Sequence, residues 1–465
     1  MAPKPKNIAE LRQQAYQVVT VREELRRNLI HRIRAGQPIF PGIIGYEETV
    51  IPKVENAILS GQDIIFLGER GQAKSRLLRN LVNLLDEEVP AIAGCEINDD
   101  PYAPVCKACR TRLAERGDAT EIAWLTRDRR YGEKLATPDI TMADMIGEVD
   151  PIKVAEGRYL ADELTIHYGL IPRTNRGIFC INELPDLSER IQVGLFNIME
   201  ERDLQIRGYT IRLPLDIYIV ASANPEDYTN RGRIITPLKD RYGAEVRTHY
   251  PRTLGDEITI MEMECSHFHD EGHSITIPQY MKEIVAEFTA LARTSPDVNQ
   301  RSGVSVRVSI ANYETIMANA LRRAIRLGER EASPRISDLP YMVASTTGKI
   351  ELETAEDGKE EKLIEGLSRR AVANVFGRHF KVEALEPLVS QFEEGLTIET
   401  SEDVAARDYV ELVGFIPALR EALKSINGEE HPAAIASAVE FVLEGLHLNR
   451  RLNKDKVAGK ARYRS

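Results

Sequence analysis

Short apolar runs alternate with longer amphipathic stretches through the first half of the chain. The runs that predict strands are bounded by polar or turn residues: Ile64–Leu67, Ala91–Ile97, Gly177–Ile181, Ile217–Ala221 and Glu245–Tyr250. Helical patterns, such as those over 75–85 and 187–201, lie between them. Strands that alternate with helices in this way form a parallel sheet with helices on its faces. The pattern therefore predicts an α/β core over residues 39–252.

The rest of the chain has helical patterns instead. Residues 8–34 predict an amphipathic helix, and strand signals stop after Pro251. Residues 254–348 predict four helices, and residues 361–447 predict three or four more. We therefore expect four parts: an N-terminal helical segment (1–38), the α/β core with hairpin inserts (39–252), a helical lid (253–350) and a helical C-terminal region with a basic tail (351–465).

Composition narrows the class of protein. The chain has 465 residues, of which 43% are hydrophobic and 29% charged, an ordinary balance for a globular protein of several domains. It has no apolar run of about 18 residues and no apolar segment at its start, so we expect no membrane span and no secretion signal. Five cysteines are too few for a disulfide framework in a chain of this length, which favours the cytoplasm.

Net charge bears on the partners that the chain can bind. The formal charge is -11, and a negative chain repels nucleic acid except through a local basic patch. The stretch 450–464 is rich in Lys and Arg and contains one acidic residue, Asp455. We interpret this tail as a solvated, disordered end rather than as a nucleic-acid arm.

A glycine-containing loop follows the first predicted strand and precedes a helix. Its sequence, Gly68-Glu69-Arg70-Gly71-Gln72-Ala73-Lys74-Ser75, nearly matches the P-loop pattern. Such a loop wraps backbone N–H groups around the phosphates of ATP, so that Lys74 would reach the β- and γ-phosphates and the Ser75 hydroxyl would bind Mg²⁺. Ala73 stands where the pattern has glycine, and its methyl group is tolerable there only at a negative φ. The alternative is an ordinary strand-to-helix turn with an incidental Lys-Ser pair.

Polar residues close the third and fourth predicted strands. The third ends in Asn182 and Glu183, which is typical of a Walker B motif, where the first position holds Mg²⁺ and the second polarises the attacking water. Asn182 replaces an acidic residue, so we expect weaker Mg²⁺ binding, whereas Glu183 keeps the general base, so we expect turnover to survive. Asn224, at the end of the fourth strand, is placed to orient the water, although Asn before Pro is also a common turn residue.

Two arginines are candidates for stabilising the charge that develops during hydrolysis. Arg241, just before the fifth predicted strand, is placed to reach the nucleotide of a neighbouring subunit. Arg231 and Arg233 are alternatives for that role, and an ordinary surface arginine is a further interpretation. Arg307, at the start of the helix predicted over 305–327, would reach the γ-phosphate from the lid.

Cys95, Cys106 and Cys109 form a Cys-x10-Cys-x2-Cys pattern after the second predicted strand. Two thiolates separated by two residues can chelate Zn²⁺, with a third from the other end of the loop. No His is near in sequence, so a fourth ligand would come from Asp99, Asp100 or a distant residue. The alternative is a set of reduced, partly buried thiols.

Together these motifs resemble those of the AAA+ ATPases of the magnesium-chelatase ATPase-subunit and MoxR group, over about Phe40–Leu327. The phosphate loop is similar to the MoxR variant, in which Ala commonly precedes the Lys. Gly169–Phe179 is similar to the segment leading into Walker B of chelatase subunits, and Leu238–Gly243 to their arginine-finger segment. The resemblance implies two hairpins, at about 146–173 and 204–213, and it carries the family's functional roles onto Lys74, Ser75, Glu183, Asn224, Arg241 and Arg307.

The resemblance implies an α/β P-loop AAA+ fold and an ATP-hydrolysing motor. Such motors typically form hexameric rings that remodel or activate a client protein, often with a von Willebrand A-domain partner. This chain has no Asp-x-Ser-x-Ser motif of that domain, so the partner would be a separate polypeptide. Two alternatives remain open. Asn182 favours a nucleotide-gated scaffold that barely hydrolyses ATP, while a DNA-directed helicase or transcription activator is disfavoured by the missing GAFTGA loop, the lack of a helix-turn-helix signal and the negative charge.

Overall fold

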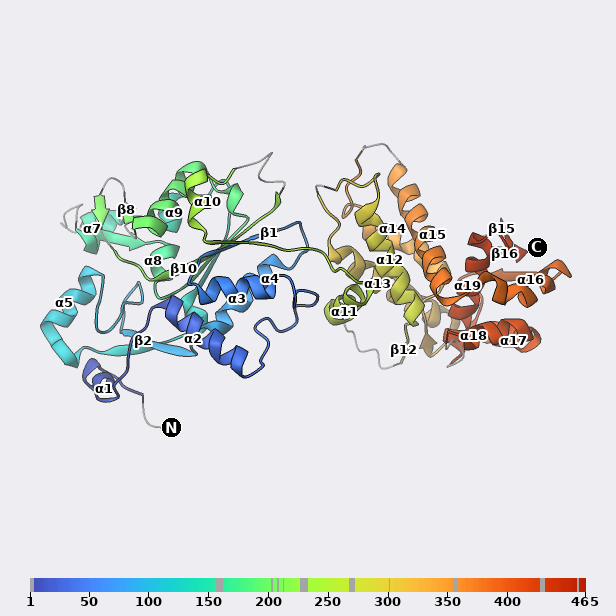
Figure 1. Ribbon diagram of the computed structural model, residues 1–465, viewed down its shortest axis with the longest axis horizontal. Coiled ribbons are helices and arrows are strands. Elements are labelled where there is room, and N and C mark those ends of the chain that lie inside the picture. The colour runs from blue at the N-terminus through green and yellow to red at the C-terminus, as the bar shows by residue number, and fades with distance from the viewer. Residues whose placement is uncertain are drawn as a thin grey trace. The chain divides into compact units, whose positions relative to one another are not determined.

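The computed structural model describes residues 4–155, 162–201, 204–206, 209–211, 213–225, 233–266, 272–300, 302–353, 358–426, 431–457 and 460–465. It divides into two compact units, Met1–His249 and Tyr250–Ser465 (Figure 1). Within the described ranges, no helix combines the length and the apolar character that crossing a membrane would require.

A parallel sheet of five strands forms the centre of the first unit, in the order β11-β1-β10-β7-β4. The strands are β1 (Ile64–Leu67), β4 (Tyr131–Leu135), β7 (Gly177–Asn182), β10 (Ile217–Ala223) and β11 (Ala244–Arg247). Every pairing is parallel, so the carboxyl ends of the strands meet along one edge of the sheet. The segments that follow β1, β7 and β10 leave from this edge, which is where open α/β sheets bind ligands.

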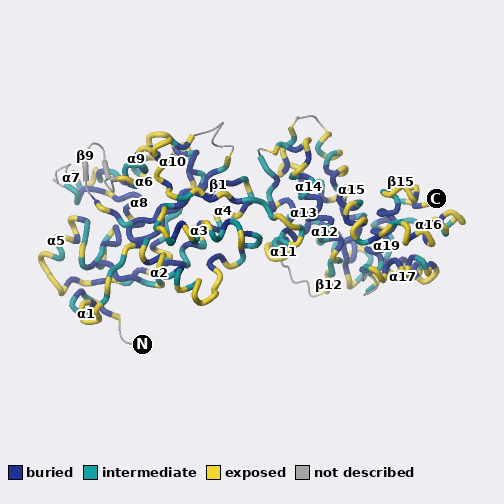
Figure 2. Tube along the Cα trace, viewed as in Figure 1, coloured by how far each residue is buried: buried dark blue, intermediate teal, exposed yellow. Residues whose placement is uncertain are grey.

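Helices cover both faces of this sheet, which explains the unbroken apolar runs in its strands. Alternate side chains along a strand point to opposite faces: Phe66 packs in one cluster and Leu67 in the other. The first cluster includes residues of α2 (Val21–Arg34), α3 (Ile51–Leu59) and α4 (Lys74–Asn80). The second includes residues of α8 (Leu170–Arg173), α9 (Glu189–Glu201) and α10 (Thr236–Arg241). Figure 2 shows the buried strands between these helices.

The structure corrects the expected second strand of the sheet. Ala91–Ile97 is not a sheet strand, because β2 (Glu88–Ile92) pairs with β3 (Ile122–Thr126) in a separate antiparallel ribbon. The remaining sheet strand is β4, with the polar sequence Tyr-Gly-Glu-Lys-Leu. It lies at the edge of the sheet and is only partly buried, so it needs no apolar run.

The expected helix over 8–34 is also wrong. Two helices occupy this stretch, α1 (Ile8–Gln13) and α2, and Ala15 adopts a positive φ between them. The side chain of Thr20 and that of Glu23 cap the start of α2 reciprocally, which fixes where that helix begins. Local capping chemistry therefore divides a stretch whose hydrophobic pattern is continuous.

Two antiparallel hairpins extend from the core where the resemblance implies them. β5 (Gly147–Val149) pairs with β6 (Ile166–Tyr168), and β8 (Leu204–Ile206) pairs with β9 (Tyr209–Ile211). Parts of both expected segments, at 156–161, 207–208 and 212, lie outside the described residues. The other elements of this unit are α5 (Lys107–Arg116), α6 (Met142–Met145), α7 (Pro151–Ala155) and the 3₁₀ turns η1 (Leu81–Leu84), η2 (Gly117–Ala119), η3 (Arg127–Arg130), η4 (Glu163–Thr165) and η5 (Leu184–Asp186).

Helices make up most of the second unit. They are α11 (Leu254–Glu264), α12 (Gln279–Thr294), α13 (Val306–Leu327), α14 (Met342–Thr346), α15 (Lys359–His379), α16 (Glu386–Glu393), α17 (Ala406–Phe415), α18 (Pro417–Lys424) and α19 (Pro432–Leu448), with the 3₁₀ turns η7 (Ile336–Tyr341) and η8 (Val382–Leu385). One hydrophobic core runs through them. Within it, Tyr280 of α12 stacks on Phe441 of α19 with ring centroids 4.4 Å apart. The segments expected as lid and C-terminal region therefore share a core.

Short strands in the second unit overturn the expectation that strand signals stop after Pro251. β12 (Ser274–Ile275) pairs with β13 (Glu331–Ala332), and β16 (Lys460–Arg464) pairs with both β14 (Ile398–Thr400) and β15 (Asn453–Val457). The described part of the basic tail is thus ordered, and the expectation of a disordered end is wrong. Tyr463 supplies the reason: its ring is buried, and its hydroxyl donates to Glu444 Oε2 at 2.6 Å.

Candidate functional site

The loop Gly68–Ser75 runs from the carboxyl end of β1 into the first turn of α4. Gly68 has no room for a side chain, because a Cβ there would lie 1.9 Å from Thr248 Oγ1 and 2.3 Å from Gln72 Oε1. Gly71 adopts a φ of +79°, in the left-handed region that favours glycine. The tight turn leaves a pocket beside the loop, lined among others by Gly68, Gln72, Pro225, Lys239 and Thr248.

Side chains that sequence reasoning missed hold the loop in shape. Gln72 is buried, and its Oε1 accepts hydrogen bonds from the Glu69 N–H at 3.1 Å and from the Thr248 hydroxyl at 2.8 Å. The Tyr46 hydroxyl donates to the Gln72 carbonyl oxygen at 2.9 Å. Burial raises the pKa of Tyr46 to about 12, so this hydroxyl remains a donor at neutral pH. Tyr46 and Thr248 lie far from the loop in sequence and belong to no recognisable motif.

Ala73 differs from the expectation for it. Its φ is +55°, so the expected negative φ is wrong. The left-handed conformation costs a residue with a Cβ roughly 1–2 kcal/mol, because the Cβ crowds the following carbonyl oxygen. The loop therefore stores local strain at the residue before Lys74, where the P-loop pattern has glycine.

The Lys74 ammonium group folds back onto the loop. Its Nζ donates to the carbonyl oxygens of Gly68 at 2.5 Å and Glu69 at 2.8 Å, and to Asn224 Oδ1 at 2.7 Å. The residue is 7% exposed, and these acceptors engage all the N–H donors of the ammonium group. The loop thus holds a buried cation at residue 74, the position whose lysine contacts phosphate in the P-loop pattern.

Asn224 joins Lys74 to Glu183. Asn224 follows β10, and its Nδ2 donates to Glu183 Oε2 at 2.7 Å while its Oδ1 accepts from Lys74. Glu183 follows β7 with a φ of +58°, and its N–H donates to Ser222 Oγ at 3.1 Å. Three neighbouring strands therefore bring the loop lysine, the expected water-orienting amide and the expected general base into one hydrogen-bonded chain.

Asn182 ends β7, and its side-chain amide lies between a hydrogen-bond acceptor on one side and two hydroxyl donors on the other. Nδ2 donates to Glu133 Oε1 at 2.6 Å, while Oδ1 accepts from the hydroxyl groups of Ser75 at 3.5 Å and Ser222 at 3.3 Å. A carboxylate can only accept hydrogen bonds, so Glu133 orients the amide with its carbonyl oxygen toward Ser75. The oxygen expected to face Mg²⁺ is the one that faces Ser75.

Glu133 is an acidic residue of this site that sequence reasoning missed. It lies on β4 and forms an ion pair with Arg79 of α4 at 2.9 Å. Hydrogen bonding to Arg79 lowers the pKa of Glu133, against the opposing effect of partial burial, so the carboxylate is ionised at neutral pH. Glu133 thus supplies a negative charge beside the neutral Asn182. Glu133 could not be predicted as a site residue, because β4 has no apolar run to mark it as a strand.

Ser75 and Asn182 fit the ligand preference of Mg²⁺. Both present oxygen atoms, which this hard cation prefers, and the two atoms lie 3.5 Å apart. Neighbouring ligands of an octahedral Mg²⁺ ion lie about 3 Å apart, given metal–oxygen distances of 2.0–2.1 Å. A small movement of either side chain would therefore let both bind one ion.

The expected arginines lie on other elements. Arg241 ends α10 and forms an ion pair with Glu200 of α9. Arg307 is exposed in the first turn of α13, in the second unit. Of the alternatives, Arg233 is exposed and Arg231 lies outside the described residues. The roles of these arginines stay predictions.

Cys95, Cys106 and Cys109 meet in the first unit. Their Sγ atoms and a carboxylate oxygen of Asp99 all lie within 4.8 Å of one another. Of the two acidic residues considered as a fourth ligand, Asp99 belongs to this group and Asp100 does not. The group lies in the segment that links β2 to α5, outside the central sheet.

No family model matches the chain, but the chain is similar to subunits of magnesium chelatase. The magnesium-chelatase subunit ChlI of Nostoc sp. strain PCC 7120 is 25% identical over 380 residues, covering 77% of this chain and 94% of that protein. ChlI of Anabaena variabilis is 24% identical over 346 residues, covering 70% and 95%. Among solved structures, a complex between subunits BchI and BchD of magnesium chelatase matches with a TM-score of 0.36 and 19% identity, covering 70% of this chain and 100% of that one. The similarity to the Nostoc protein extends over more of the chain than the motif-bearing region Phe40–Leu327.

Proposed function

We propose that the chain is an AAA+ ATPase of the magnesium-chelatase group, to whose subunits it is similar, and that it binds ATP in the loop Gly68–Ser75 and hydrolyses it with Glu183 as the general base. The observation that carries this proposal is the hydrogen-bonded chain Lys74–Asn224–Glu183 at the carboxyl edge of the sheet. Phosphoryl transfer depends on positioned groups and compensating charge more than on covalent chemistry. A cation, an amide and a carboxylate held in contact are groups of the kinds that this reaction uses.

In the proposed reaction, Lys74 exchanges the carbonyl oxygens of Gly68 and Glu69, together with Asn224 Oδ1, for oxygens of the β- and γ-phosphates. The exchange frees Asn224 Oδ1 to accept a hydrogen bond from the attacking water, while Asn224 Nδ2 continues to hold Glu183. Glu183 then takes a proton from that water. Without nucleotide, each of these groups is satisfied by another, so binding of the triphosphate is the event that releases the catalytic amide.

Ser75 and Asn182 are the residues that would hold Mg²⁺ in this proposal. The ion would supply positive charge against the β- and γ-phosphates. A neutral amide oxygen attracts the ion less strongly than a carboxylate does, and the charge of Glu133 acts from behind the amide. We therefore expect turnover to require more Mg²⁺ than it would with an acidic residue at 182.

A nucleotide-gated scaffold is the second candidate function, and Asn182 is the observation that favours it. In this function ATP binding, rather than its hydrolysis, would switch the protein between two states. The same loop and the same Lys74 exchange would serve the switch. The two candidates differ in one measurable quantity, the rate of phosphate release from the wild-type protein.

The proposal extends to assembly and partners. In a hexameric ring, Arg241 would exchange Glu200 for the γ-phosphate bound by the neighbouring subunit and neutralise transition-state charge. The client would be a separate polypeptide, and a von Willebrand A-domain protein is the class that we propose. Copurification with the Glu183→Gln protein held in ATP would identify it.

Two substitutions test the proposed hydrolysis. Lys74→Ala should weaken ATP binding by about 100-fold or more, because it removes a buried charge-assisted contact to phosphate. Glu183→Gln should bind ATP as the wild type does and lose on the order of 10²–10⁴ in turnover, the usual contribution of a general base. Binding and phosphate release of the full-length proteins would be measured side by side.

Lys53→Ala provides the matched control, since Lys53 is exposed on α3 and should change neither quantity. Hydrolysis by Glu183→Gln at the wild-type rate would remove Glu183 from its role. Tight binding with no detectable turnover in the wild type would select the scaffold.

A further inference from the structure

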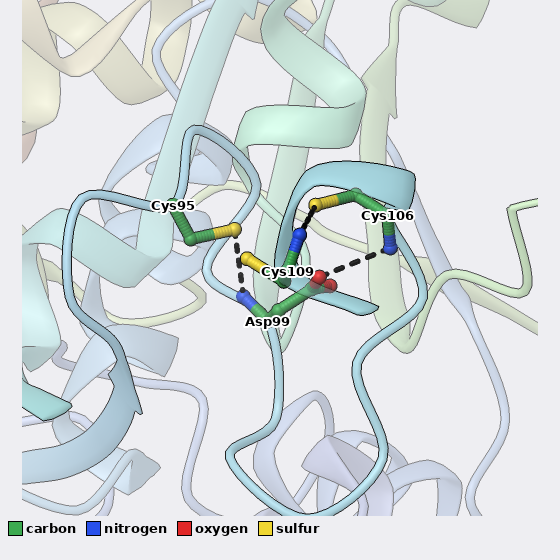
Figure 3. Close-up of side chains that lie close together, drawn as sticks. All are labelled: Cys95, Asp99, Cys106 and Cys109. Carbon is green, nitrogen blue, oxygen red and sulfur yellow. Dashed lines mark hydrogen bonds between the residues drawn. The ribbon is translucent and has the colours of Figure 1, made fainter. Parts of the chain in front are cut away.

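Four side chains with metal-binding atoms converge between the loop after β2 and the first turn of α5 (Figure 3). Cys95 and Asp99 lie in the loop after β2, Cys106 is the N-cap of α5, and Cys109 lies in the first turn of that helix. Cys106, Cys109 and Asp99 are buried, and Cys95 is partly so. Residues up to fourteen positions apart in sequence are therefore held around one enclosed point.

Asp99 has an unsatisfied oxygen at this point. The residue is 0% exposed; its Oδ2 accepts from the Cys106 N–H at 3.0 Å, and its Oδ1 has no hydrogen-bond partner among the described residues. Leaving a buried polar atom without a partner costs about 1–3 kcal/mol, and more if the group is charged. Such an atom next to three thiols is accounted for by a cation that all four residues share.

Backbone N–H groups around the sulfur atoms favour the thiolate form that binds metal. The N–H groups of Ile97 and Asp99 donate to Cys95 Sγ, each at 3.4 Å, and the N–H of Cys109 donates to Cys106 Sγ at 3.3 Å. Cys106 and Cys109 also lie at the N-terminus of a ten-residue helix, where the partial positive charge of the backbone stabilises an anion. Hydrogen bonds of this kind orient metal ligands and adjust their basicity.

We propose that Cys95, Asp99, Cys106 and Cys109 bind one structural Zn²⁺ ion. Tetrahedral Zn²⁺ holds thiolates at about 2.3 Å and carboxylate oxygens at about 2.0–2.2 Å, which places the ligand atoms roughly 3.5–3.8 Å from one another. The observed limit of 4.8 Å requires only a small contraction. Four protein ligands leave no open position for water, as in structural rather than catalytic zinc sites.

Ligand type and spacing distinguish Zn²⁺ from other occupants. Mg²⁺ and Ca²⁺ select oxygen ligands, so three thiolates exclude them. A four-iron cluster places its irons at alternate corners of a cube, and the surrounding thiolates, each bound to a different iron, must lie farther apart than around a single ion. The compact group of ligand atoms within 4.8 Å therefore fits one ion better than a cluster.

The proposed ion would also stabilise the segment that leads into β7, the strand that ends at the nucleotide site. The Asn98 side chain donates to the Arg173 carbonyl oxygen at 2.7 Å, and the Asn175 side chain donates to the Ile97 carbonyl oxygen at 3.0 Å. Arg173 and Asn175 immediately precede β7, the strand that ends at Asn182. The loop after β2, which carries Cys95 and Asp99, is thus tied to the segment that leads into β7, without contributing a ligand to the nucleotide.

A second set of contacts ties α5, which starts at the proposed site, to the segment just before β6 in the β5–β6 hairpin. The Lys107 N–H donates to Glu163 Oε1 at 2.6 Å, and the Arg110 guanidinium forms an ion pair with the same carboxylate at 3.2 Å. Lys107 also forms an ion pair with Asp162 at 2.8 Å. Loss of the ion should therefore loosen both this hairpin and the start of β7, while the P-loop keeps its own contacts.

Metal analysis of the full-length protein, purified without chelators or an affinity metal, tests the proposal. We expect one zinc ion per chain in the wild type, its loss in Cys106→Ser and Cys109→Ser, and at least tenfold weaker zinc affinity in Asp99→Asn. Cys265→Ser is the matched control, since Cys265 is a buried thiol of the second unit and should leave the zinc content unchanged. Zinc retained in both Cys106→Ser and Cys109→Ser would overturn the assignment.

Two further measurements keep the test decisive if a variant fails to fold. Cobalt(II) added to zinc-depleted wild-type protein should give the visible absorption and thiolate charge-transfer bands of a tetrahedral sulfur site. Zinc removal should also lower the thermal midpoint reported by the only tryptophan, Trp124 of β3, by several degrees. Wild-type protein that contains no zinc and takes up neither metal, or that contains iron and sulfide or a disulfide at these cysteines, would contradict the proposal.

Discussion

An aspartate at residue 182 would supply both an oxygen facing the metal position and a negative charge. In this protein Asn182 supplies the oxygen and Glu133 supplies the charge. The Asn182 carbonyl oxygen faces Ser75, and the Glu133 carboxylate lies behind the amide at 2.6 Å. Electrostatic attraction falls with distance, and the guanidinium of Arg79 offsets part of the Glu133 charge. The site should therefore attract Mg²⁺ more weakly than one with a direct carboxylate ligand.

Asn182→Asp alone should not restore strong Mg²⁺ binding. The substitution would replace the hydrogen bond from Asn182 to Glu133 with a contact between two carboxylates. Their mutual repulsion should raise the pKa of one of them, or push the two side chains apart. The double variant Asn182→Asp with Glu133→Gln keeps one charge and the hydrogen bond. We expect its Mg²⁺ affinity in the presence of ATP to rise by about tenfold over the wild type, equivalent to about 1.4 kcal/mol.

A Mg²⁺ titration of nucleotide binding to the three proteins measures this difference. Glu87→Gln, at an exposed glutamate away from the site, serves as the control for loss of one carboxylate. A full gain in the single variant Asn182→Asp would show that Glu133 does not constrain residue 182.

At the scale of elements, most of the sheet strands that sequence reasoning identified correctly are those whose burial leaves a continuous apolar signature. The exception is the edge strand β11, which overlaps the strand predicted over Glu245–Tyr250. β1, β7 and β10 lie inside the sheet with helices on both faces, and their apolar runs predicted them. β4 lies at the sheet edge and carries Glu133, so its polar sequence concealed both the strand and the residue. β16 carries one buried residue, Tyr463, among charged neighbours, and its composition predicted disorder instead.

Tyr463→Ala should destabilise the second unit by about 3–5 kcal/mol, the usual cost of deleting a buried aromatic ring. Its hydroxyl also satisfies the buried carboxylate of Glu444. Arg464→Ala is the matched control, because Arg464 is exposed and its ion pair with Asp455 should contribute less than about 1 kcal/mol. Denaturation followed by far-ultraviolet circular dichroism would report the helices of both units, while Trp124 fluorescence would report the first unit alone. Equal stability of the two variants would show that the tail adds nothing to the fold.

At the scale of the whole molecule, the parallel sheet organises the site by collecting short motifs at one edge. Lys74, Asn224 and Glu183 lie together because each follows, directly or through the loop, the carboxyl end of a neighbouring strand. Their positions after predicted strands are what made them candidates from the sequence. Tyr46 and Thr248 could not be predicted in this way, since their contacts with the loop arise from packing of distant segments. The parallel sheet and the helical second unit agree with the α/β core and the helical regions expected from the sequence.

The most direct test of this account is a structure of the full-length protein with Mg²⁺ and a non-hydrolysable ATP analogue. We predict that Lys74 Nζ leaves the carbonyl oxygens of Gly68 and Glu69 and contacts the β- and γ-phosphates, with Glu183 and Asn224 beside the terminal phosphate. An empty loop at saturating analogue, or a Glu183 carboxylate turned away from the bound phosphates, would contradict the account.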